Sequence, residues 1–210
     1  MLKQLRPALV SVLAFTVLTG FLFPAVIWAL GNAVFPRQAL GSLIESDGKV
    51  IGSEIIGQNF AHPEYFHPRP SAAGSGYDAA ASSGTNLGPT SRKLIEGAAD
   101  DAATKDTDES YAGVKQLVAA YRAENGLPAN MPVPADAVTR SASGLDPHIS
   151  AENAALQAGR VARARGITEG DVRRLVAAHT EGRTFGILGE RRVNVVLLNR
   201  DLDNAAERQR

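Results

Sequence analysis

The 210-residue sequence contains no cysteine. This absence excludes a disulfide framework and any metal site built from thiolates, and it leaves the cellular compartment open. Two motifs with which enzymes hold phosphates or zinc, G-x-x-x-x-G-K-[ST] and H-E-x-x-H, are also missing. The same holds for the G-x-S-x-G turn that exposes a nucleophilic serine in α/β-hydrolases. The sequence therefore gives little support for catalysis by this chain alone.

A strong charge of one sign is missing too, because the formal net charge is zero. The charges are nevertheless unevenly placed. Residues 1–37 carry three bases, Lys3, Arg6 and Arg37, and no acid. Residues 38–210 contain the other 19 of the 22 bases and all 22 acids. This part of the chain therefore has a net charge of about −3 with histidine neutral. This part lacks the basic footprint of a nucleic-acid-binding protein, and we expect no nucleic-acid partner.

Between Arg6 and Arg37 there is no charged side chain at all. The stretch from Leu9 to Leu30 is dense in Leu, Val, Phe and Ile. At about 1.5 Å per residue, this stretch spans roughly 33 Å as a helix, close to the thickness of the hydrocarbon core of a bilayer. We therefore predict a transmembrane helix over residues 7–35.

Two other interpretations of this run fit less well. A cleaved signal peptide has an apolar core of about 7 to 15 residues and a small-residue cleavage site, which residues 29–31 (ALG) match poorly. A buried helix of a soluble protein does not need apolar side chains on all sides over such a length. Gly20 and Pro24 lie inside the run and predict a kink or a close helix–helix contact.

The flanking charges predict the orientation of the span. Lys3 and Arg6 precede it without any acid, whereas Arg37 stands alone after it. The positive-inside bias places residues 1–6 in the cytoplasm, so that residues 36–210 form one extracytoplasmic domain. That length is enough for a single domain with its own core.

Local signals in this domain predict a mixed α/β fold. Asp47-Gly48 between two short apolar runs is typical of a β-hairpin. Caps and helical periodicity predict helices over residues 91–125, 151–165 and 168–180. The apolar run 192–199 is interpreted as a buried strand. Residues 98–110 are acidic and poor in apolar side chains, so a loop or a break there is an alternative to a continuous first helix.

Residues 57–91 form a long stretch rich in Gly, Pro, Ser and Ala. Loops of this length in compact domains are either functional or disordered. The aromatic residues Phe60, Tyr65, Phe66 and Tyr77 argue against disorder. We expect an ordered, irregular surface segment.

Few residues suggest catalytic chemistry. Ser141, Ser143, Asp146 and His148 have the residue types of a hydrolytic triad, but they fall within eight residues, where local capping bonds are the default. His62 and His67 lie five residues apart, which is no specific spacing for metal ligands. A single membrane helix cannot enclose a pore either.

Several motifs occur in a fixed order along the chain. They are residues 5–8 (LRPA), 56–60 (IGQNF), 65–72 (YFHPRPSA), 83–89 (SGTNLGP), 141–150 (SASGLDPHIS), 160–165 (RVARAR) and 193–199 (VNVVLLN). In this order they resemble the C subunit of Kdp-type potassium-transporting ATPases, and the resemblance covers nearly the whole chain. The family's Ser-Gly-Gly reads Ser83-Gly84-Thr85 here, which weakens any analogy with a phosphate-binding glycine turn.

The resemblance implies a complex in the bacterial inner membrane. Its channel-like A subunit carries potassium, its P-type ATPase B subunit hydrolyses ATP, and a small F subunit completes it. The C subunit is non-catalytic, has one membrane helix, and places its extracytoplasmic domain against the A subunit. It acts as a catalytic chaperone that raises the ATP affinity of the B subunit. The resemblance thus implies no cofactor for the chain itself, with ATP acting through the ATPase subunit.

The resemblance also suggests individual site residues. Gln157 matches the family position credited with nucleotide contact, whereas a structural role on its helix face is the alternative. Arg69 is a fixed charge between two prolines, and we predict that it contacts a partner subunit or, alternatively, orders its own loop. Partner contacts are predicted for its neighbours Gln58, Asn59, Tyr65 and Phe66 as well.

Two further functions compete with that of a pump subunit. One is a membrane-tethered extracytoplasmic hydrolase that uses Asp146 and His148. The other is a tethered ligand-binding or sensor domain that uses residues 57–91.

Overall fold

The computed structural model describes residues 2–46, 48–97 and 111–207. The chain divides into two compact units, Met1–Ser53 and Glu54–Arg210. Each unit is described by itself.

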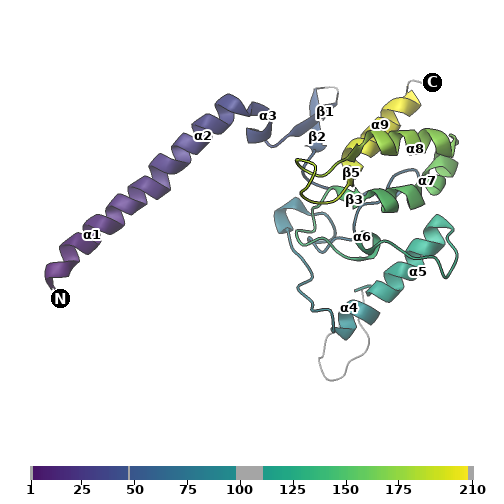
Figure 1. The fold of residues 1–210 in the computed structure, drawn as a ribbon, viewed down its shortest axis with the longest axis horizontal. Coiled ribbons are helices and arrows are strands. Elements are labelled where there is room, and N and C mark those ends of the chain that lie inside the picture. The colour runs from purple at the N-terminus through teal and green to yellow at the C-terminus, as the bar shows by residue number, and fades with distance from the viewer. Residues whose placement is uncertain (1, 47, 98–110, 208–210) are drawn as a thin grey trace. The chain divides into compact units, whose positions relative to one another are not determined.

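The first unit begins with a long apolar helix (Figure 1). It consists of α1 (Leu2–Val17), a π-helical turn η1 (Leu18–Leu22) and α2 (Phe23–Val34). Residues Lys3–Val34 have a mean hydropathy of 2.2 over their most apolar part, and none of that part is buried within the protein. The predicted helix is thus confirmed, and it is long and apolar enough to cross a membrane.

The irregularity predicted around Gly20 and Pro24 takes the form of the π-helical turn. The N–H of Phe23 donates to the carbonyl of Leu18, five residues back. Pro24 follows immediately; it has no N–H, and its ring would crowd the carbonyl four residues earlier in a regular helix. A wider turn just before the proline relieves that crowding.

The predicted hairpin is also confirmed. After the short helix α3 (Pro36–Ala39), strand β1 (Leu43–Ser46) pairs antiparallel with β2 (Lys49–Ser53). Gly48 adopts φ 71°, the left-handed conformation that the tight turn requires. The register shifts between Ile44 and Glu45, and Ile44 is buried while most of the other side chains of the hairpin remain accessible.

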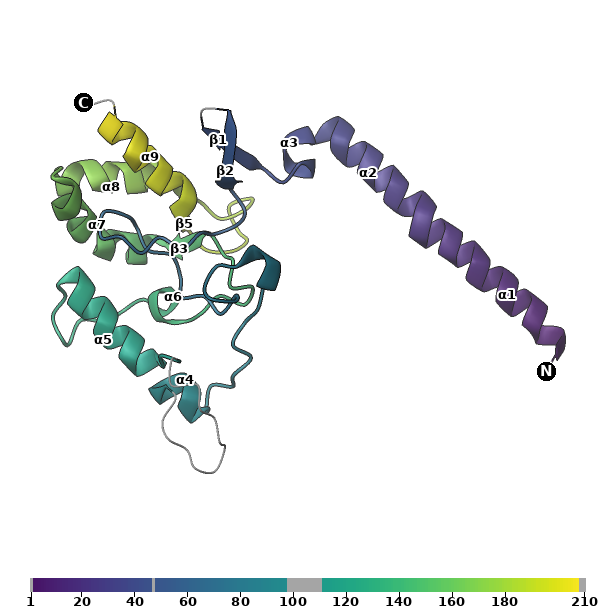
Figure 2. The same cartoon turned by 180° about the vertical axis from the view of Figure 1, so that it is seen from behind.

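The second unit combines a small sheet with helices, as the mixed α/β prediction requires. Within residues 54–97 and 111–207, three strands lie in the antiparallel order β3 (His148–Ser150), β5 (Arg192–Asn194), β4 (Thr180–Glu181). The longer helices are α5 (Val114–Asn125), α7 (Ala151–Arg165), α8 (Glu169–Ala178) and α9 (Val195–Glu207). Shorter ones are η2 (Ala79–Ala81), α4 (Arg92–Glu96) and α6 (Ala135–Val138). In both views α7, α8 and α9 gather at one end of the unit, and α4 and α5 at the other (Figures 1 and 2).

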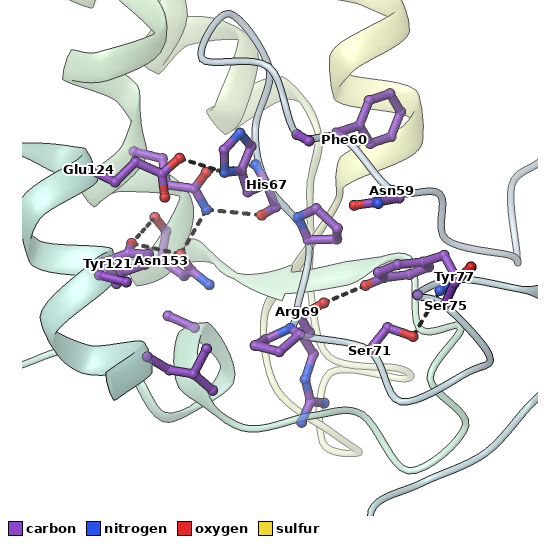
Figure 3. Close-up of a pocket in the computed structure, with 18 residues that line it drawn as sticks. Asn59, Phe60, His67, Arg69, Ser71, Ser75, Tyr77, Tyr121, Glu124 and Asn153 are labelled. Atoms are coloured by element: carbon purple, nitrogen blue, oxygen red, sulfur yellow. Dashed lines mark hydrogen bonds and ion pairs between the residues drawn. The ribbon is translucent and has the colours of Figure 1, made fainter. Parts of the chain in front are cut away.

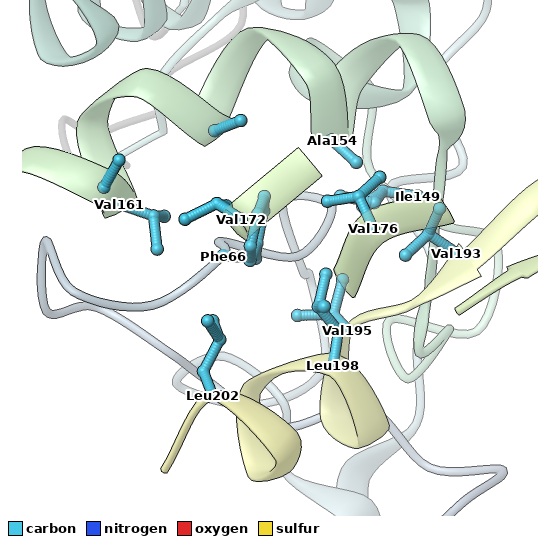
Figure 4. Close-up of a cluster of buried hydrophobic side chains, with 12 residues drawn as sticks. Phe66, Ile149, Ala154, Val161, Val172, Val176, Val193, Val195, Leu198 and Leu202 are labelled. Carbon is cyan, nitrogen blue, oxygen red and sulfur yellow. The ribbon is translucent and has the colours of Figure 1, made fainter. Parts of the chain in front are cut away.

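The hydrophobic core lies where α7, α8 and α9 meet the sheet (Figure 4). Small residues on α7, Ala154 and Ala158, are fully buried and let the neighbouring elements approach closely. Phe66 is the one member contributed by the irregular segment. The core residues are Phe66, Ile149, Ala154, Ala158, Val161, Ala162, Val172, Val176, Val193, Val195, Leu198 and Leu202.

The ends of α7 and α8 follow the predicted caps. The Ser150 hydroxyl accepts a hydrogen bond from the Asn153 N–H at 3.0 Å, and Thr168 does the same for Asp171 at 3.1 Å. Gly166 ends α7 in the left-handed conformation, with φ 67°. These local bonds satisfy N–H groups that the first turn of a helix leaves unpaired.

The prediction of a strand over residues 192–199 is wrong beyond Asn194. Strand β5 ends there, and Val195 starts α9. The Asn194 side-chain oxygen accepts hydrogen bonds from the N–H groups of Val196 and Leu197, both at 3.1 Å. Asn194 thus caps a helix whose apolar residues face the core, and a short apolar run does not by itself separate this arrangement from a strand.

The predicted helix over residues 91–125 is not continuous in the described residues. Ser91 caps α4 by accepting a hydrogen bond from the Leu94 N–H at 3.3 Å. That helix ends at Glu96, because Gly97 turns the chain with φ 92°. Helix α5 begins only at Val114 and ends at Asn125, with Gly126 as the predicted C-cap. The acidic stretch 98–110 lies outside the described residues.

Candidate functional site

Gln157 is the central residue of a buried polar network on α7. Its side chain is 1% exposed. Its amide oxygen accepts from the His67 N–H at 2.7 Å and from Arg160 Nη2 at 2.7 Å. Its amide nitrogen donates to the His67 carbonyl at 3.0 Å and to the Asn153 side-chain oxygen at 2.9 Å. A glutamine amide has two donors and two acceptor positions, so all four are used within the domain.

Arg160, one turn further along α7, ties the irregular segment to the helix. Its side chain is only 6% exposed. Nη1 donates to the carbonyls of Pro63 and Tyr65 at 2.6 and 2.9 Å, and Nε donates to the Asn125 side-chain oxygen at 3.0 Å. Burial lowers the pKa of Arg160, although Glu124 opposes this effect. A buried guanidinium needs such partners, because burying a charge is costly unless it is hydrogen-bonded.

Asn153 extends the network towards α5 and α6. Its side-chain oxygen accepts from the Tyr121 hydroxyl at 2.8 Å, and its amide nitrogen donates to Asp136 Oδ2 at 3.0 Å. Asp136 also accepts from the Ser150 N–H at 2.7 Å, which fixes the start of α7. Burial raises the pKa of Tyr121, so this hydroxyl stays protonated as a donor. The network thus fixes the positions of α5, α6 and the irregular segment against one helix.

A pocket of about 440 Å³ opens beside this network (Figure 3). His67 and Glu124 face one another there, with 2.8 Å between His67 Nδ1 and Glu124 Oε1. The hydrogen bond from His67, together with the charges of His67 and Arg160, lowers the pKa of Glu124 despite partial burial. Asn59 is exposed at this pocket, and Gln157 forms part of its wall. In the described residues no group of three or more His, Asp or Glu side chains could hold a metal ion.

The irregular segment 57–91 is ordered largely by the turn at residues 141–146. The Ser71 hydroxyl donates to the Gly144 carbonyl at 2.7 Å, and the Ser83 N–H donates to the Ser143 carbonyl at 3.0 Å. The Gly57 N–H donates to the Leu145 carbonyl at 2.8 Å. The prediction of an ordered, irregular segment is therefore confirmed for most of its length, since backbone groups without a regular ladder find partners in this turn.

Arg69 makes contacts within its own domain. Nη1 lies 3.3 Å from Asp146 Oδ2, and Nη2 donates to the carbonyls of Thr139 and Arg140, both at 3.4 Å. The Arg69 carbonyl accepts from the Tyr77 hydroxyl at 2.7 Å. These bonds agree with the alternative that Arg69 orders its own loop. They are long for charge-assisted hydrogen bonds, so the guanidinium is held loosely.

The other residues predicted at partner contacts have different surroundings. The Tyr65 hydroxyl lies 3.1 Å from Asp203 Oδ2, and the Arg165 guanidinium lies 4.9 Å from the centre of the Tyr65 ring. Phe66 is fully buried, and its backbone forms two hydrogen bonds with the Asn199 side chain, at 2.8 and 2.9 Å. Phe66 therefore positions the segment from inside, and its contact with a partner subunit stays a prediction. Gln58 is half-buried.

Asp146 and His148 form a local turn rather than a catalytic pair. Asp146 Oδ1 accepts from the His148 N–H at 3.0 Å and lies 3.3 Å from His148 Nδ1. Within the described residues, no serine hydroxyl is hydrogen-bonded to His148. The Ser143 hydroxyl instead accepts from the Leu145 N–H at 3.1 Å, which is the local bonding expected of such a turn. The geometry gives no support to hydrolysis at this position.

Sequence reasoning missed several residues of these sites. Asn153 and Asn199 are buried amides whose hydrogen bonds hold the irregular segment in place. Their position on the inner face of predicted secondary structure could have indicated this role. Arg191 and Arg192 line a second cavity, of about 570 Å³, together with Arg69 and Asp146. Arginines after a glycine-rich apolar stretch, residues 184–189 (TFGILG), could have indicated a surface loop with binding potential.

Comparison with known proteins identifies the family. A family profile described as "KdpC: K+-transporting ATPase, c chain" matches residues 5–204. A protein of Mycobacterium tuberculosis named "Potassium-transporting ATPase KdpC subunit" is 54% identical over 203 residues, which cover 97% of this chain and 99% of that protein. Proteins of the same name from Caulobacter vibrioides and Koribacter versatilis are 52% and 48% identical over 204 residues, covering 97% of this chain and 94% and 95% of theirs. The chain belongs to the KdpC family, the c chains of K+-transporting ATPases.

Proposed function

We propose that this chain is a non-catalytic accessory subunit of a potassium-transporting ATPase. One observation carries the proposal: the family match runs from residue 5 to residue 204 and so includes both the apolar helix and the folded unit. The site geometry agrees with this proposal. The polar groups of the buried network around Gln157 are hydrogen-bonded to other groups of the same domain, and the network offers no activated nucleophile. Its polar groups serve to hold a surface in shape, which suits a subunit whose task is assembly.

The apolar helix is the membrane anchor in this proposal. Lys3 and Arg6 place the N-terminus in the cytoplasm, and the domain is then extracytoplasmic. We propose that the chain assembles with the channel-like A subunit, the P-type ATPase B subunit and the small F subunit of a Kdp complex. It contributes no pore, since one helix cannot enclose an ion path.

The chain acts on ATP only through the ATPase subunit in this proposal. It lacks a P-loop and the D-K-T-G-T phosphorylation site of P-type ATPases, and it has no cofactor of its own. As a catalytic chaperone it raises the ATP affinity of the B subunit by favouring the state of the complex that binds ATP. Gln157 is a structural residue here, which is supported by its four internal hydrogen bonds.

Copurification tests this function. The full chain, tagged and expressed with its chromosomal neighbours, should retain a P-type ATPase and a channel-like protein through washing in mild detergent. The purified chain alone should hydrolyse no ATP, and the assembly should hydrolyse ATP in a potassium-dependent manner. A chain that is isolated without such partners from cells that produce them would refute the proposal.

A further inference from the structure

The β1–β2 hairpin, which follows the apolar helix along the chain, exposes several apolar side chains (Figure 1). Leu43, Val50 and Ile51 are 45%, 56% and 50% exposed, whereas Ile44 is 3% exposed. We call Leu43, Val50 and Ile51 the hairpin face. Single apolar side chains on a surface need no explanation, but a cluster of them is unfavourable in water and indicates a contact surface.

The strand register places Leu43 and Val50 on the same side of the hairpin. Glu45 pairs with Val50, and paired residues of antiparallel strands point to the same side. Leu43 lies two residues before Glu45 on β1, and side chains two residues apart share a side. Leu43, Glu45 and Val50 therefore share one side of the two-stranded sheet.

A β-bulge brings Ile51 to this side as well. Ile44 pairs with Gly52, so these two residues belong to the opposite side. Ile51 precedes Gly52 and by alternation returns to the side of Leu43. Because the register shifts here, the next residue, Val50, keeps that side, whereas a regular strand would place Val50 and Ile51 on opposite sides. The bulge thus gathers the apolar side chains on one side.

Hydrogen bonds tie the hairpin to the end of the apolar helix. Helix α2 stops before Phe35, whose φ of −130° and ψ of 57° turn the chain into α3. The Ser42 N–H donates to the Arg37 carbonyl at 2.9 Å, just before β1 begins. The Ser53 hydroxyl, at the end of β2, donates to the Gly41 carbonyl at 2.7 Å. Both ends of the hairpin are therefore fixed close to Arg37 and cannot move far from the helix.

The length of the uncharged run places this turn at the level of the lipid headgroups. At about 1.5 Å per helical residue, residues 7–36 extend over roughly 45 Å between Arg6 and Arg37. A bilayer with its headgroups is about 40–45 Å thick. When Arg6 lies in one headgroup layer, Arg37 therefore lies in the other. Leu40, which is 67% exposed, and the hairpin follow within a few residues.

We propose that the hairpin face lies on the phospholipid bilayer, with Leu43, Val50 and Ile51 inserted at the boundary between headgroups and acyl chains. This inference rests on the membrane anchor of the proposed function and gives that anchor a second contact with lipid. The helix spans the bilayer, and the hairpin lies on its surface. A helix alone leaves the chain free to rotate about the point where it leaves the membrane, and a hairpin held on the surface restricts this rotation.

The charges around the hairpin are balanced. In residues 35–53, Arg37 and Lys49 offset Glu45 and Asp47. The contact therefore depends on apolar burial and not on anionic lipid. Glu45 is exposed on the same side as the hairpin face. Its carboxylate stays in the headgroup layer, because the cost of a charge falls steeply from the centre of a bilayer to its interface.

The composition of the hairpin face favours lipid over a protein partner. The energetic centres of protein interfaces are enriched in Trp, Tyr and Arg, whereas Leu and Val are under-represented there. The hairpin face consists of three aliphatic side chains. In addition, the helix keeps the bilayer within reach of the hairpin at all times, which raises the effective concentration of lipid at this face.

A fluorophore on the hairpin tests this contact in the full chain, purified in nanodiscs of neutral phosphatidylcholine. Because the chain has no cysteine, Ile51→Cys and Lys49→Cys each carry a single polarity-sensitive label. Lys49 is exposed and pairs with Ser46, on the side of Ile44, and so serves as the matched control. We expect a blue-shifted emission at position 51 and at least about threefold stronger quenching there by headgroup-proximal nitroxide lipids than at position 49. Adding anionic lipid should leave this difference unchanged.

A label at Leu13→Cys, inside the apolar helix, separates failure of the inference from failure of the proposed anchor. Equal quenching at positions 51 and 49, with the label at position 13 quenched by acyl-chain nitroxides, would overturn the inference and leave the anchor intact. An unquenched label at position 13 would overturn the anchor and the inference with it. A blue shift at position 51 that arises only in the assembled pump would show that a partner subunit covers the hairpin face, which also overturns the inference.

Removing apolar side chains from the hairpin face provides a second test. With the label moved to Leu43→Cys, Val50→Ser together with Ile51→Ser should lower its quenching by headgroup-proximal nitroxide lipids at least about twofold, because less apolar surface then holds the hairpin on the bilayer. Lys49→Ser, which changes the opposite side, should leave the quenching unchanged. Circular dichroism verifies that the variants are folded. Unchanged quenching in the folded double variant would contradict the inference.

Discussion

At the scale of single residues, Gln157 shows how one amide can organise a domain. Its side-chain amide accepts from the His67 N–H and donates to the His67 carbonyl, and so joins α7 to this backbone as a neighbouring β-strand would. We predict that Gln157→Ala lowers the free energy of unfolding of the full chain in detergent by about 2 to 4 kcal/mol. The loss arises because the His67 N–H and carbonyl would remain buried without partners. Urea titration followed by circular dichroism measures it.

The control for this substitution lies on the same helix. Arg163 is exposed, and Arg163→Ala should change the free energy of unfolding by no more than about 0.5 kcal/mol. If Gln157→Ala proves equally mild, the amide is not a structural centre, and a ligand-binding role for Gln157 becomes the better explanation.

Asp146 makes the stability of the folded domain depend on pH, and the sign of this dependence follows from its pKa. Burial alone would raise its pKa, but hydrogen bonds from His148 and the charge of Arg69 outweigh burial and lower the pKa. A carboxyl group with a lowered pKa in the folded state stabilises the fold above its ordinary pKa of about 3.9. That contribution disappears as the pH falls through the lowered value.

We predict that Asp146→Asn destabilises the chain by about 1.5 to 3 kcal/mol at pH 7 and has little effect below its lowered pKa. Chemical unfolding of both proteins between pH 7 and pH 2.5 measures the difference. Glu169→Gln, which removes an exposed ion pair on α8, should cost at most about 0.5 kcal/mol throughout. A difference between Asp146→Asn and the unsubstituted chain that stays constant with pH would contradict the assignment.

At the scale of elements, the irregular segment depends on a turn that lies far from it in the sequence. Gly144 has φ 69°, and a Cβ atom there would lie 2.7 Å from the Ala73 Cβ and the Ser83 carbonyl oxygen. We predict that Gly144→Ala destabilises the domain by about 2 kcal/mol or more, because both conformation and space oppose the methyl group. Thermal unfolding combined with limited proteolysis of residues 70–85 measures the effect.

Gly182→Ala is the matched control. No atom of the described residues lies within 4 Å of a Cβ at Gly182, and its φ is not in the left-handed region. Its effect should stay within about 0.5 kcal/mol. Equal effects of the two substitutions would mean that the turn at 141–146 does not hold the segment.

The elements also show how far the sequence could predict the fold. The caps at Ser91, Ser150 and Thr168 were predictable because each uses a local bond. The start of α9 was equally local, since Asn194 is its cap, but the β-branched residues after it favoured a strand. The partners of Gln157 and Arg69 lie up to about 90 residues away along the chain, so no local pattern could specify them.

At the scale of the whole molecule, the orientation of the chain decides whether the folded unit can reach cytoplasmic ATP. We predict that the domain is extracytoplasmic, because Lys3 and Arg6 precede the only candidate span in the described residues. A cysteine introduced at the exposed Ala119 should react with an impermeant maleimide in intact cells. A cysteine at Gln4 should react only after lysis, and the reverse pattern would contradict the orientation.

In the proposed topology, the domain can raise the ATP affinity of the pump without contacting ATP. A tenfold gain requires only about 1.4 kcal/mol of coupling between the subunits, which tighter binding to the ATP-competent state of the pump can supply. Replacing Gln157 should then weaken ATP binding only to the extent that it weakens assembly. We expect Gln157→Ala complexes, purified intact, to bind ATP within about twofold of the unsubstituted pump in a nucleotide titration. Much weaker ATP binding by a fully assembled variant, with nucleotide crosslinking to this chain, would instead require direct contact.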